Sequence, residues 1–206
     1  MKLGIALLFL GISFSCLSHP CEATKNPPTA LTAIDQSYLD AHNKRRKQWH
    51  TENGVSYVPL KWSKSLKRSA KKWAIQLRQE VCVDGGGIYH DPDNQNEGEN
   101  IAATMGSGSW GQKPPAEKIL TRYVEREIGK PGSQKGHLTQ AIWRATHYVG
   151  CAEASHDHGN GKKCHISVCR YIKPGNCNMG DWSKWKEKML AADSPCGPAC
   201  PREGCF

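Results

Sequence analysis

Residues Gly136 to Cys151 read GHLTQAIWRATHYVGC: a glycine and a histidine, an apolar helical segment, then a strand-like run that ends in a cysteine. Two other polar groups, His90 and the glutamate of the triplet Gly98-Glu99-Asn100, are expected beside His137. Glu127 lies on the apolar face of an expected helix, where burying a lone carboxylate is costly, so it needs a partner. We predict that these four side chains (His90, Glu99, Glu127 and His137) converge on one cleft.

The composition is that of a soluble globular protein with a basic surface. The chain has 206 residues, enough for one hydrophobic core, and is 38% hydrophobic and 23% charged. Its formal net charge of +9 favours an anionic partner, such as an anionic membrane surface or a sulfated glycan. Nucleic-acid recognition would need a basic stripe within a known motif, and the sequence contains none, so no nucleic-acid partner is expected.

The first 23 residues are typical of a secretory signal peptide. Lys2 supplies the positive charge, and Gly4 to Phe14 form an apolar run too short to span a membrane. No later apolar run is long enough, so no transmembrane segment is expected. Cleavage after Ser18 would leave nine cysteines, and cleavage after Ala23 would leave eight. Because exported proteins favour paired thiols, the cut after Ala23 is favoured for an extracellular protein, with residues 24–31 as a linker.

Helical spacing of apolar residues predicts two helices before residue 80. The first begins near Ile34 and ends in the basic run 44–47, which is read as a solvated helix face in preference to a glycan site. Ser63 caps the second. Its apolar stripe recurs at spacings of three and four: Leu66, Ala70, Trp73, Ala74 and Leu77.

A third helix is predicted to open at Pro114-Pro115, where proline costs least. On it, Glu127 falls within the apolar face while Glu125 points away. That face comprises Ile119, Leu120, Tyr123, Val124 and Ile128. Residues 136–144 are expected to form a short fourth helix or turn.

Two strands are predicted at 146–154 and 164–172. If they pair antiparallel, Cys151 and Cys169 lie at comparable heights, which predicts a disulfide between them. The loop 155–163 that joins the strands has the composition of a solvated turn.

Two polar segments can each be interpreted in two ways. Residues 88–113 are Gly-rich and irregular, and a loop of that length is disordered or functional. In the loop after the first strand, His156 and His158 flank Asp157. A solvated turn is favoured there over a site that collects copper or zinc.

After Asn178 the chain is expected to leave the core. Residues 181–192 resemble a basic amphipathic helix containing Trp182 and Trp185. The tail then has an odd number of cysteines, so one of them must pair outside it; the connectivity stays open. The tail cysteines are Cys196, Cys200 and Cys205, and the candidate partners are Cys82 and Cys164.

Four separate motifs resemble those of the CAP superfamily, which contains cysteine-rich secretory proteins, antigen 5 and plant pathogenesis-related 1 proteins. Besides the opening stretch, they are HNKRR at 42–46, GENI at 98–101 and CRYIKPGNCNMG at 169–180. The motifs occur in the family's order. Val124 departs from the pattern, because the family usually has tryptophan three residues before the second cleft glutamate.

The resemblance implies an α+β fold, a three-layer α-β-α sandwich with a central antiparallel sheet, stabilised by disulfides. We therefore expect a CAP (SCP) domain over residues 32–178. Residues 179–206 would follow as a short cysteine-rich extension, with too few cysteines for the channel-directed module of some relatives.

The resemblance also implies a cleft lined by two histidines and two glutamates. In this chain they fall on His90, Glu99, Glu127 and His137. Such a set would bind a divalent cation such as zinc weakly, or would be a hydrogen-bonded cluster with no ion. A metal-dependent hydrolase is the alternative function. However, the sequence contains neither HExxH nor a nucleophile elbow.

Lipid binding is the other function that the resemblance implies, since some members bind sterols in a flexible loop or fatty acids between helices. Here the candidate loop runs from Thr104 to Pro115 and holds Met105 and Trp110 among glycines. Trp110 packed back on the core is favoured over an exposed Trp110. The expected function is thus non-enzymatic: lipid or sterol binding, or an effector role.

Overall fold

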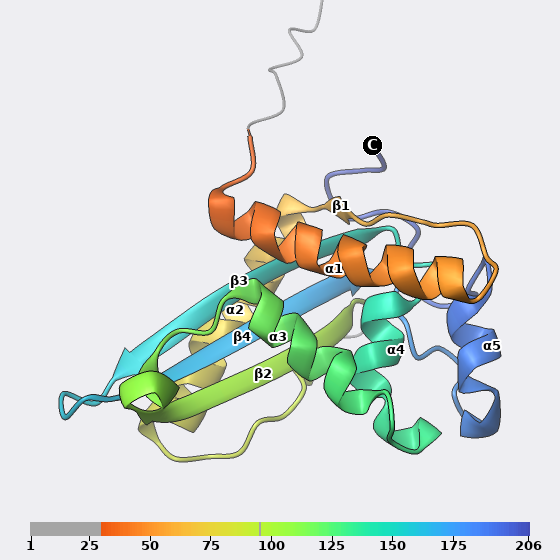
Figure 1. The fold of residues 1–206 in the computed structure, drawn as a ribbon. Helices are drawn as coiled ribbons and strands as arrows, with labels where there is room; N and C mark the ends of the chain where they lie inside the picture. Colours follow the sequence, from red (N-terminus) through yellow and green to blue (C-terminus); the bar gives the residue numbers. More distant parts are fainter. Residues whose placement is uncertain (1–29, 95) are drawn as a thin grey trace, which may run out of the picture. The chain divides into compact units, whose positions relative to one another are not determined.

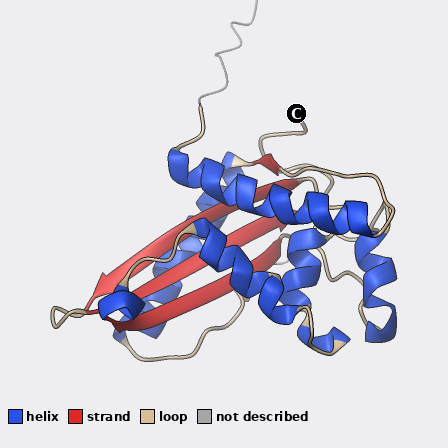
Figure 2. Ribbon diagram, in the orientation of Figure 1, coloured by secondary structure: helices blue, strands red, loops and turns tan. Residues whose placement is uncertain are grey.

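A four-stranded sheet lies between two layers of helices in the computed structural model, which describes residues 30–94 and 96–206 (Figure 1 and Figure 2). The predicted signal peptide, 1–23, and nearly all of the predicted linker lie outside the described residues. No helix in the described part of the chain is long and apolar enough to cross a membrane. The expected three-layer α+β architecture is confirmed.

The sheet has the strand order β1-β3-β4-β2. Its strands are β1 (Lys61–Trp62), β2 (Gly98–Ser107), β3 (Tyr148–Asp157) and β4 (Lys162–Ile172). β4 pairs antiparallel with both β2 and β3, but β1 pairs parallel with β3. The sheet is therefore mixed, and a wholly antiparallel sheet was wrong at this edge. Only two residues of β1 join β3 before the chain turns into the next helix.

The helices divide between the two faces of the sheet (Figure 1). They are α1 (Ala33–Glu52), α2 (Lys64–Leu77), α3 (Ala116–Tyr123), α4 (Gly136–Ile142) and α5 (Trp185–Leu190). α2 covers one face of β3 and β4, whereas α1, α3 and α4 lie over the other. The predicted cap Ser63 accepts a hydrogen bond from the backbone N–H of Leu66, and the whole apolar stripe of α2 is buried.

α1 corrects the prediction for the basic run. The helix continues past residues 44–47 to Glu52, and Arg45 and Arg46 are buried, so a solvated face was wrong for them. The Arg46 guanidinium donates to the carbonyls of Trp143 at 2.8 Å and Thr146 at 2.9 Å. Main-chain oxygens thus replace water around this cation.

β2 replaces the middle of the loop predicted over 88–113. Its ten residues contain few β-branched side chains, which is why the sequence did not predict a strand. Pairing along its whole length with β4 and burial of Ile101 and Ala102 outweigh that weak propensity.

α3 opens after Pro115 as predicted but ends earlier. A 3-10 turn, Glu125–Glu127, follows it, so Ile128 leaves the apolar face and is exposed. Glu127 is buried and Glu125 is exposed, as predicted.

The β3–β4 hairpin has longer strands and a shorter turn than predicted, because pairing continues to Asp157 and Lys163. Cys151 and Cys169 are register partners and form a disulfide. The other disulfides among the described residues are Cys82–Cys164, Cys177–Cys196 and Cys200–Cys205. The tail cysteine that pairs outside the tail is therefore joined to Cys177, and the two predicted candidates were wrong.

The C-terminal segment packs on the domain instead of leaving it. Met189 of α5 is fully buried, and the Trp185 ring meets the Trp49 ring of α1 edge-on. Glu203 accepts from the Ser63 hydroxyl at 2.6 Å and from the Ser65 N–H at 3.0 Å, at the start of α2. Leu31–Phe206 forms one compact unit, so no packing boundary separates residues 179–206 from the domain.

Candidate functional site

His90 and Glu99 form the first of two imidazole–carboxylate pairs. His90 lies in the loop before β2 and Glu99 is the second residue of that strand. The His90 Nδ1 and Glu99 Oε1 atoms are 2.6 Å apart. The imidazole is 72% exposed, whereas the carboxylate is 4% exposed. The hydrogen bond to Glu99 raises the pKa of His90 above its usual value of 6.5.

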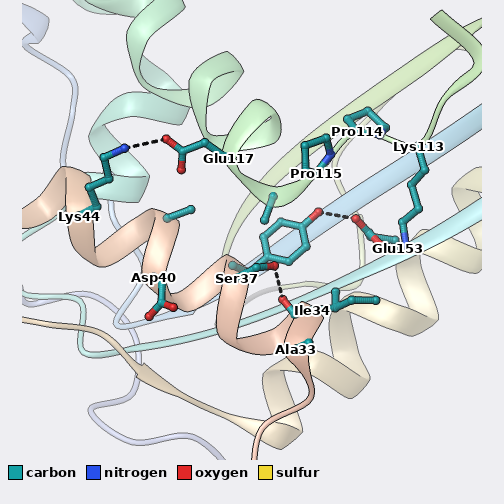
Figure 3. Close-up of a pocket in the computed structure, with 13 residues that line it drawn as sticks. Ala33, Ile34, Ser37, Asp40, Lys44, Lys113, Pro114, Pro115, Glu117 and Glu153 are labelled. Atoms are coloured by element: carbon teal, nitrogen blue, oxygen red, sulfur yellow. Dashed lines mark hydrogen bonds and ion pairs between the residues drawn. The ribbon is translucent and has the colours of Figure 1, made fainter. Parts of the chain in front are cut away.

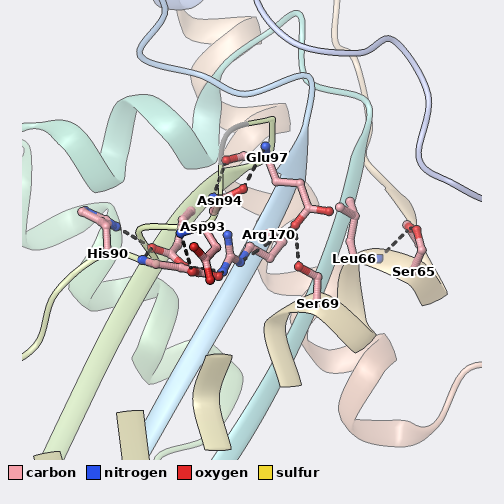
Figure 4. Close-up of polar contacts among 11 residues, drawn as sticks. Ser65, Leu66, Ser69, His90, Asp93, Asn94, Glu97 and Arg170 are labelled. Carbon is pink, nitrogen blue, oxygen red and sulfur yellow. Dashed lines mark hydrogen bonds and ion pairs between the residues drawn. The ribbon is translucent and has the colours of Figure 1, made fainter. Parts of the chain in front are cut away.

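Arg170 is the buried cation beneath this pair (Figure 4). It is the register partner of Glu99 on β4. Its Nη2 lies 2.6 Å from Asp91 Oδ2 and 2.9 Å from Glu99 Oε2, the latter an ion pair without hydrogen-bond geometry. Sequence reasoning missed Arg170. The available signal was a charged residue within the apolar run of a central strand, since such a charge must be paired.

His137 and Glu127 form the second pair, at 2.7 Å between Nδ1 and Oε1. The other carboxylate oxygen accepts from the backbone N–H of Leu138, in the first turn of α4, at 2.9 Å. The His137 ring stacks on Tyr123, with centroids 5.3 Å apart. Sequence reasoning did not relate Tyr123 to His137.

Lys135 supports the second pair from behind. It is buried, its Nζ donates to the Glu127 carbonyl at 2.6 Å, and it lies over the Trp185 ring of α5. Lys135 was also missed, because lysine ordinarily indicates surface.

Asn100 links the two pairs. It follows Glu99 on β2, and its Nδ2 donates to the His137 carbonyl at 3.0 Å and to the Tyr171 hydroxyl at 3.2 Å. The four predicted side chains therefore occur as two pairs on adjoining elements. No three of their ligand atoms lie within 4.8 Å of one another. Among the described residues, a different group of side chains does lie that close together.

That group is His42, Cys151 and Cys169, and its chemistry excludes a metal. The two sulfurs are joined in a disulfide, so neither is a thiolate. The His42 nitrogens lie 2.7 Å from the Tyr38 carbonyl and 2.9 Å from the Tyr171 hydroxyl. Burial lowers the pKa of His42 to about 4, so the ring is neutral. The group is part of the core.

The arrangement of each pair suits a ligand of the free imidazole nitrogen. A carboxylate occupies Nδ1 of both His90 and His137, and their Nε2 atoms make no hydrogen bond to the described residues. Both imidazoles are exposed at least in part. A carboxylate behind an imidazole is the usual support of a metal-bound histidine. Two imidazoles alone fit zinc, but they leave its other positions to water and hence bind it weakly.

Two apolar hollows lie away from the pairs. The first, of about 670 Å³, lies between the start of α1 and the segment before α3 (Figure 3). Glu153 lies at its wall, where it accepts from the Tyr38 hydroxyl at 2.7 Å and pairs with Lys113. The second, of about 560 Å³, lies between β2, the 3-10 turn Gly108–Gly111 and α3. Lys113, Pro114 and Pro115 line both.

Trp110 and Met105 line the second hollow. Trp110 is 72% exposed, so packing back on the core was wrong. Met105 is also exposed but belongs to β2 and not to a loop. The cations Lys118, Arg122 and Arg126 of α3 and the turn after it line the same hollow.

Comparison with known proteins finds cysteine-rich secretory and pathogenesis-related proteins. The sequence model of the cysteine-rich secretory protein family, CAP, matches residues 39–171. Pathogenesis-related protein 1A of Nicotiana tabacum is 30% identical over 169 residues, covering 79% of this chain and 84% of the relative. Cysteine-rich secretory protein 3 of Homo sapiens is 25% identical over 214 residues, covering 98% and 80%.

Solved structures share the fold. The structure of BmVAL-1 matches with a TM-score of 0.53 at 25% identity, covering 73% of this chain and 82% of that one. The crystal structure of NaASP2 with Zn²⁺ matches with a TM-score of 0.52 at 19% identity, covering 73% and 85%.

Proposed function

Because the chain belongs to the cysteine-rich secretory protein (CAP) family, we propose that it is a secreted, non-enzymatic binder of a lipid such as a sterol or a fatty acid. A divalent cation held weakly by the two His–Glu pairs is the second element of the proposal. The observation that carries the lipid function is the pair of apolar hollows that meet at Lys113, Pro114 and Pro115.

The hollows have the size and chemistry of lipid sites. Their volumes, about 670 and 560 Å³, fall within the range of roughly 300–1,000 Å³ typical of small-molecule pockets. The wall of the first is largely apolar, whereas the second combines apolar groups with four cations, Lys113, Lys118, Arg122 and Arg126. Glu153 and Lys113 supply a polar pair at the wall of the first.

The surroundings of the second hollow suit approach to an anionic membrane surface. Trp110 is exposed beside Lys118 and Arg126, which are exposed too. Tryptophan is favoured where one part of a side chain is apolar and the other wet, and nearby cations are attracted to anionic headgroups. A sulfated glycan would meet the same cations but would gain nothing from Trp110.

Equilibrium binding of a fluorescent sterol and a fluorescent fatty acid tests the lipid function. We expect saturable binding of at least one of them. Ser37 lines the first hollow and Trp110 the second. Ser37→Trp should therefore obstruct the first hollow and Trp110→Ala should weaken binding in the second, which identifies the hollow used. Ile75→Ala, an exposed apolar site on α2, is the matched control. Absence of saturable binding of either lipid would overturn the proposal.

The metal element rests on the free Nε2 atoms and the carboxylates behind them. NaASP2, which shares the fold, has been crystallised with Zn²⁺. Calorimetric titration with zinc should give weak binding that is lost in both His90→Ala and His137→Ala. His147→Ala is the control, because His147 is exposed and outside the pairs. Equal heats in the parent and both cleft variants would leave the pairs a purely structural cluster.

A metal-dependent hydrolase is the weaker alternative. A general base needs an oxygen free to take a proton from water. Glu99 already accepts from His90 and the Asp91 N–H and lies against Arg170, and Glu127 accepts from His137 and Leu138. Peptidase activity in the parent that disappears in Glu99→Ala and His137→Ala would favour the alternative.

A further inference from the structure

Two histidines outside the cleft meet at the end of the β3–β4 hairpin. The solvated loop expected there is shorter, because β3 continues to Asp157 and the turn follows. His156 lies in β3 and His158 is the first residue after it, where its N–H still donates to the Lys162 carbonyl at 2.9 Å. Because this contact continues the pairing of the hairpin, the alternation of an extended chain directs both imidazoles to one face and Asp157 to the other.

The spacing of the two ring centroids lies within the range that chelation of one ion allows. Their centroids are 4.7 Å apart and their planes are at 87°. In a metal–imidazole bond of about 2.0–2.1 Å, the ion lies roughly 3.2 Å from the ring centroid. Two such rings at an angle slightly above 90° about one ion would have centroids roughly 4.5–5 Å apart.

Neither imidazole is committed to another group in the described part of the chain. His158 Nε2 is buried with no hydrogen-bond partner there. Asp157, on the opposite face, accepts from the Gly159 N–H at 2.9 Å and pairs with Lys163 at 3.4 Å. The carboxylate is thus satisfied without the histidines, unlike Glu99 and Glu127 in the cleft.

We propose that His156 and His158 form a second metal site, which takes Cu²⁺ in preference to Zn²⁺. Imidazole suits both ions, and divalent copper binds a given nitrogen site more tightly than zinc. The remaining positions are open to water or to a donor from another molecule. Imidazoles must be deprotonated to ligate, so copper is released on acidification. This site is independent of lipid binding and of the cleft pairs.

Copper binding by the full secreted chain tests the site, in a His90→Ala/His137→Ala background that removes the cleft imidazoles. Calorimetry and electron paramagnetic resonance with Cu²⁺ alone should show one class of site with nitrogen hyperfine splitting. His156→Ala or His158→Ala added to the background should abolish it. His147→Ala and Asp157→Asn should retain it, the first as a matched imidazole control and the second as a test of the opposite face.

Thermal melts of each variant establish that lost binding is not lost folding. Absence of nitrogen-ligated copper in the background protein would mean that the rings only pack edge to face, a contact with the same spacing. Binding that survives removal of both histidines would equally overturn the site. Loss of binding in Asp157→Asn alone would assign the ion to the other face.

Discussion

The two His–Glu pairs have the same chemistry, but different groups hold their carboxylates in place. Their N–O distances are 2.6 and 2.7 Å, and both carboxylates are buried. Glu99 lies against Arg170, a buried cation from the neighbouring strand. Glu127 is held by a backbone N–H of α4 and, through its carbonyl, by Lys135. The imidazoles differ as well, at 72% exposure for His90 and 40% for His137.

The first pair therefore depends on an ion network between residues distant in sequence, whereas the second depends on a short stretch of chain. Glu99 and Arg170 are 71 positions apart and meet only when β2 pairs with β4. Glu127, Lys135 and His137 lie within eleven residues. Removing one group from each network should therefore have effects of different size.

Arg170→Met should give the largest effect. It leaves Asp91 and Glu99 facing each other without their buried cation, and breaking a buried ion pair costs about 3–5 kcal/mol. Urea unfolding of parent and variant measures the loss. Adding Asp91→Asn to Arg170→Met should recover part of it. A loss within the range of a surface pair, under about 1 kcal/mol, would contradict the ion-network interpretation.

Glu127→Gln should cost less, about 1.5–3 kcal/mol, the usual contribution of a hydrogen bond to a charged group. The Gln amide oxygen can still accept from the Leu138 N–H, but the amide NH2 then faces His137 and cannot accept the hydrogen bond from Nδ1. Glu125→Gln is the matched control: Glu125 is half-exposed and pairs with the buried Arg45, which keeps its ion pair with Glu117, so the loss should be under about 1 kcal/mol. Equal losses in the two variants would show that the second pair adds nothing to the fold.

These networks also mark the limit of what the sequence could predict. The α2 stripe was found because its apolar spacing is a local signal, and Glu127 was found because a carboxylate on an apolar face is anomalous. Arg170 and Lys135 were missed, since the sequence does not indicate which residue a single charged side chain will contact. His90 and Glu99 have no periodicity that relates them, and they were assigned through the family resemblance.

The fold shows the same limit. β2 was read as a loop because its small residues have weak strand propensity, and only the register with β4 makes it a strand. Trp110 was expected in the core because tryptophan is usually buried, yet the turn Gly108–Gly111 holds it outside. The first error concerns pairing between strands distant in sequence, and the second concerns a side chain placed by a local turn.

The His90 pair should also show a pH signature. Its folded pKa is raised by Glu99, so its stabilising contribution is fully present below the unfolded pKa of about 6.5 and is lost as pH rises through the folded pKa. An NMR titration should place His90 above 6.5, and Glu99→Gln should lower it. A His90 pKa unchanged by that substitution would mean that the pair is not formed in solution.

The buried His42 should behave in the opposite way and serves as an internal reference. Its folded pKa of about 4 lies below the unfolded value. As pH falls, this histidine is therefore protonated in the unfolded chain before it is protonated in the folded protein. Stability attributable to His42 is therefore lost as pH falls from about 6.5 towards 4. The same titration should show His42 unprotonated at pH 6, where His90 is largely protonated.

Zinc should give the smallest effect and the sharpest comparison of the pairs. A ligand at a concentration equal to its Kd stabilises the fold by only about 0.4 kcal/mol, and by about 1.4 kcal/mol at ten times that concentration. If one ion uses both imidazoles, His90→Ala and His137→Ala should each abolish the zinc-induced rise in Tm. If each variant instead keeps about half of the bound zinc in calorimetry, the pairs hold separate ions. The two pairs would then be two independent sites. Asn100 would connect them only through its hydrogen bond to the His137 backbone carbonyl.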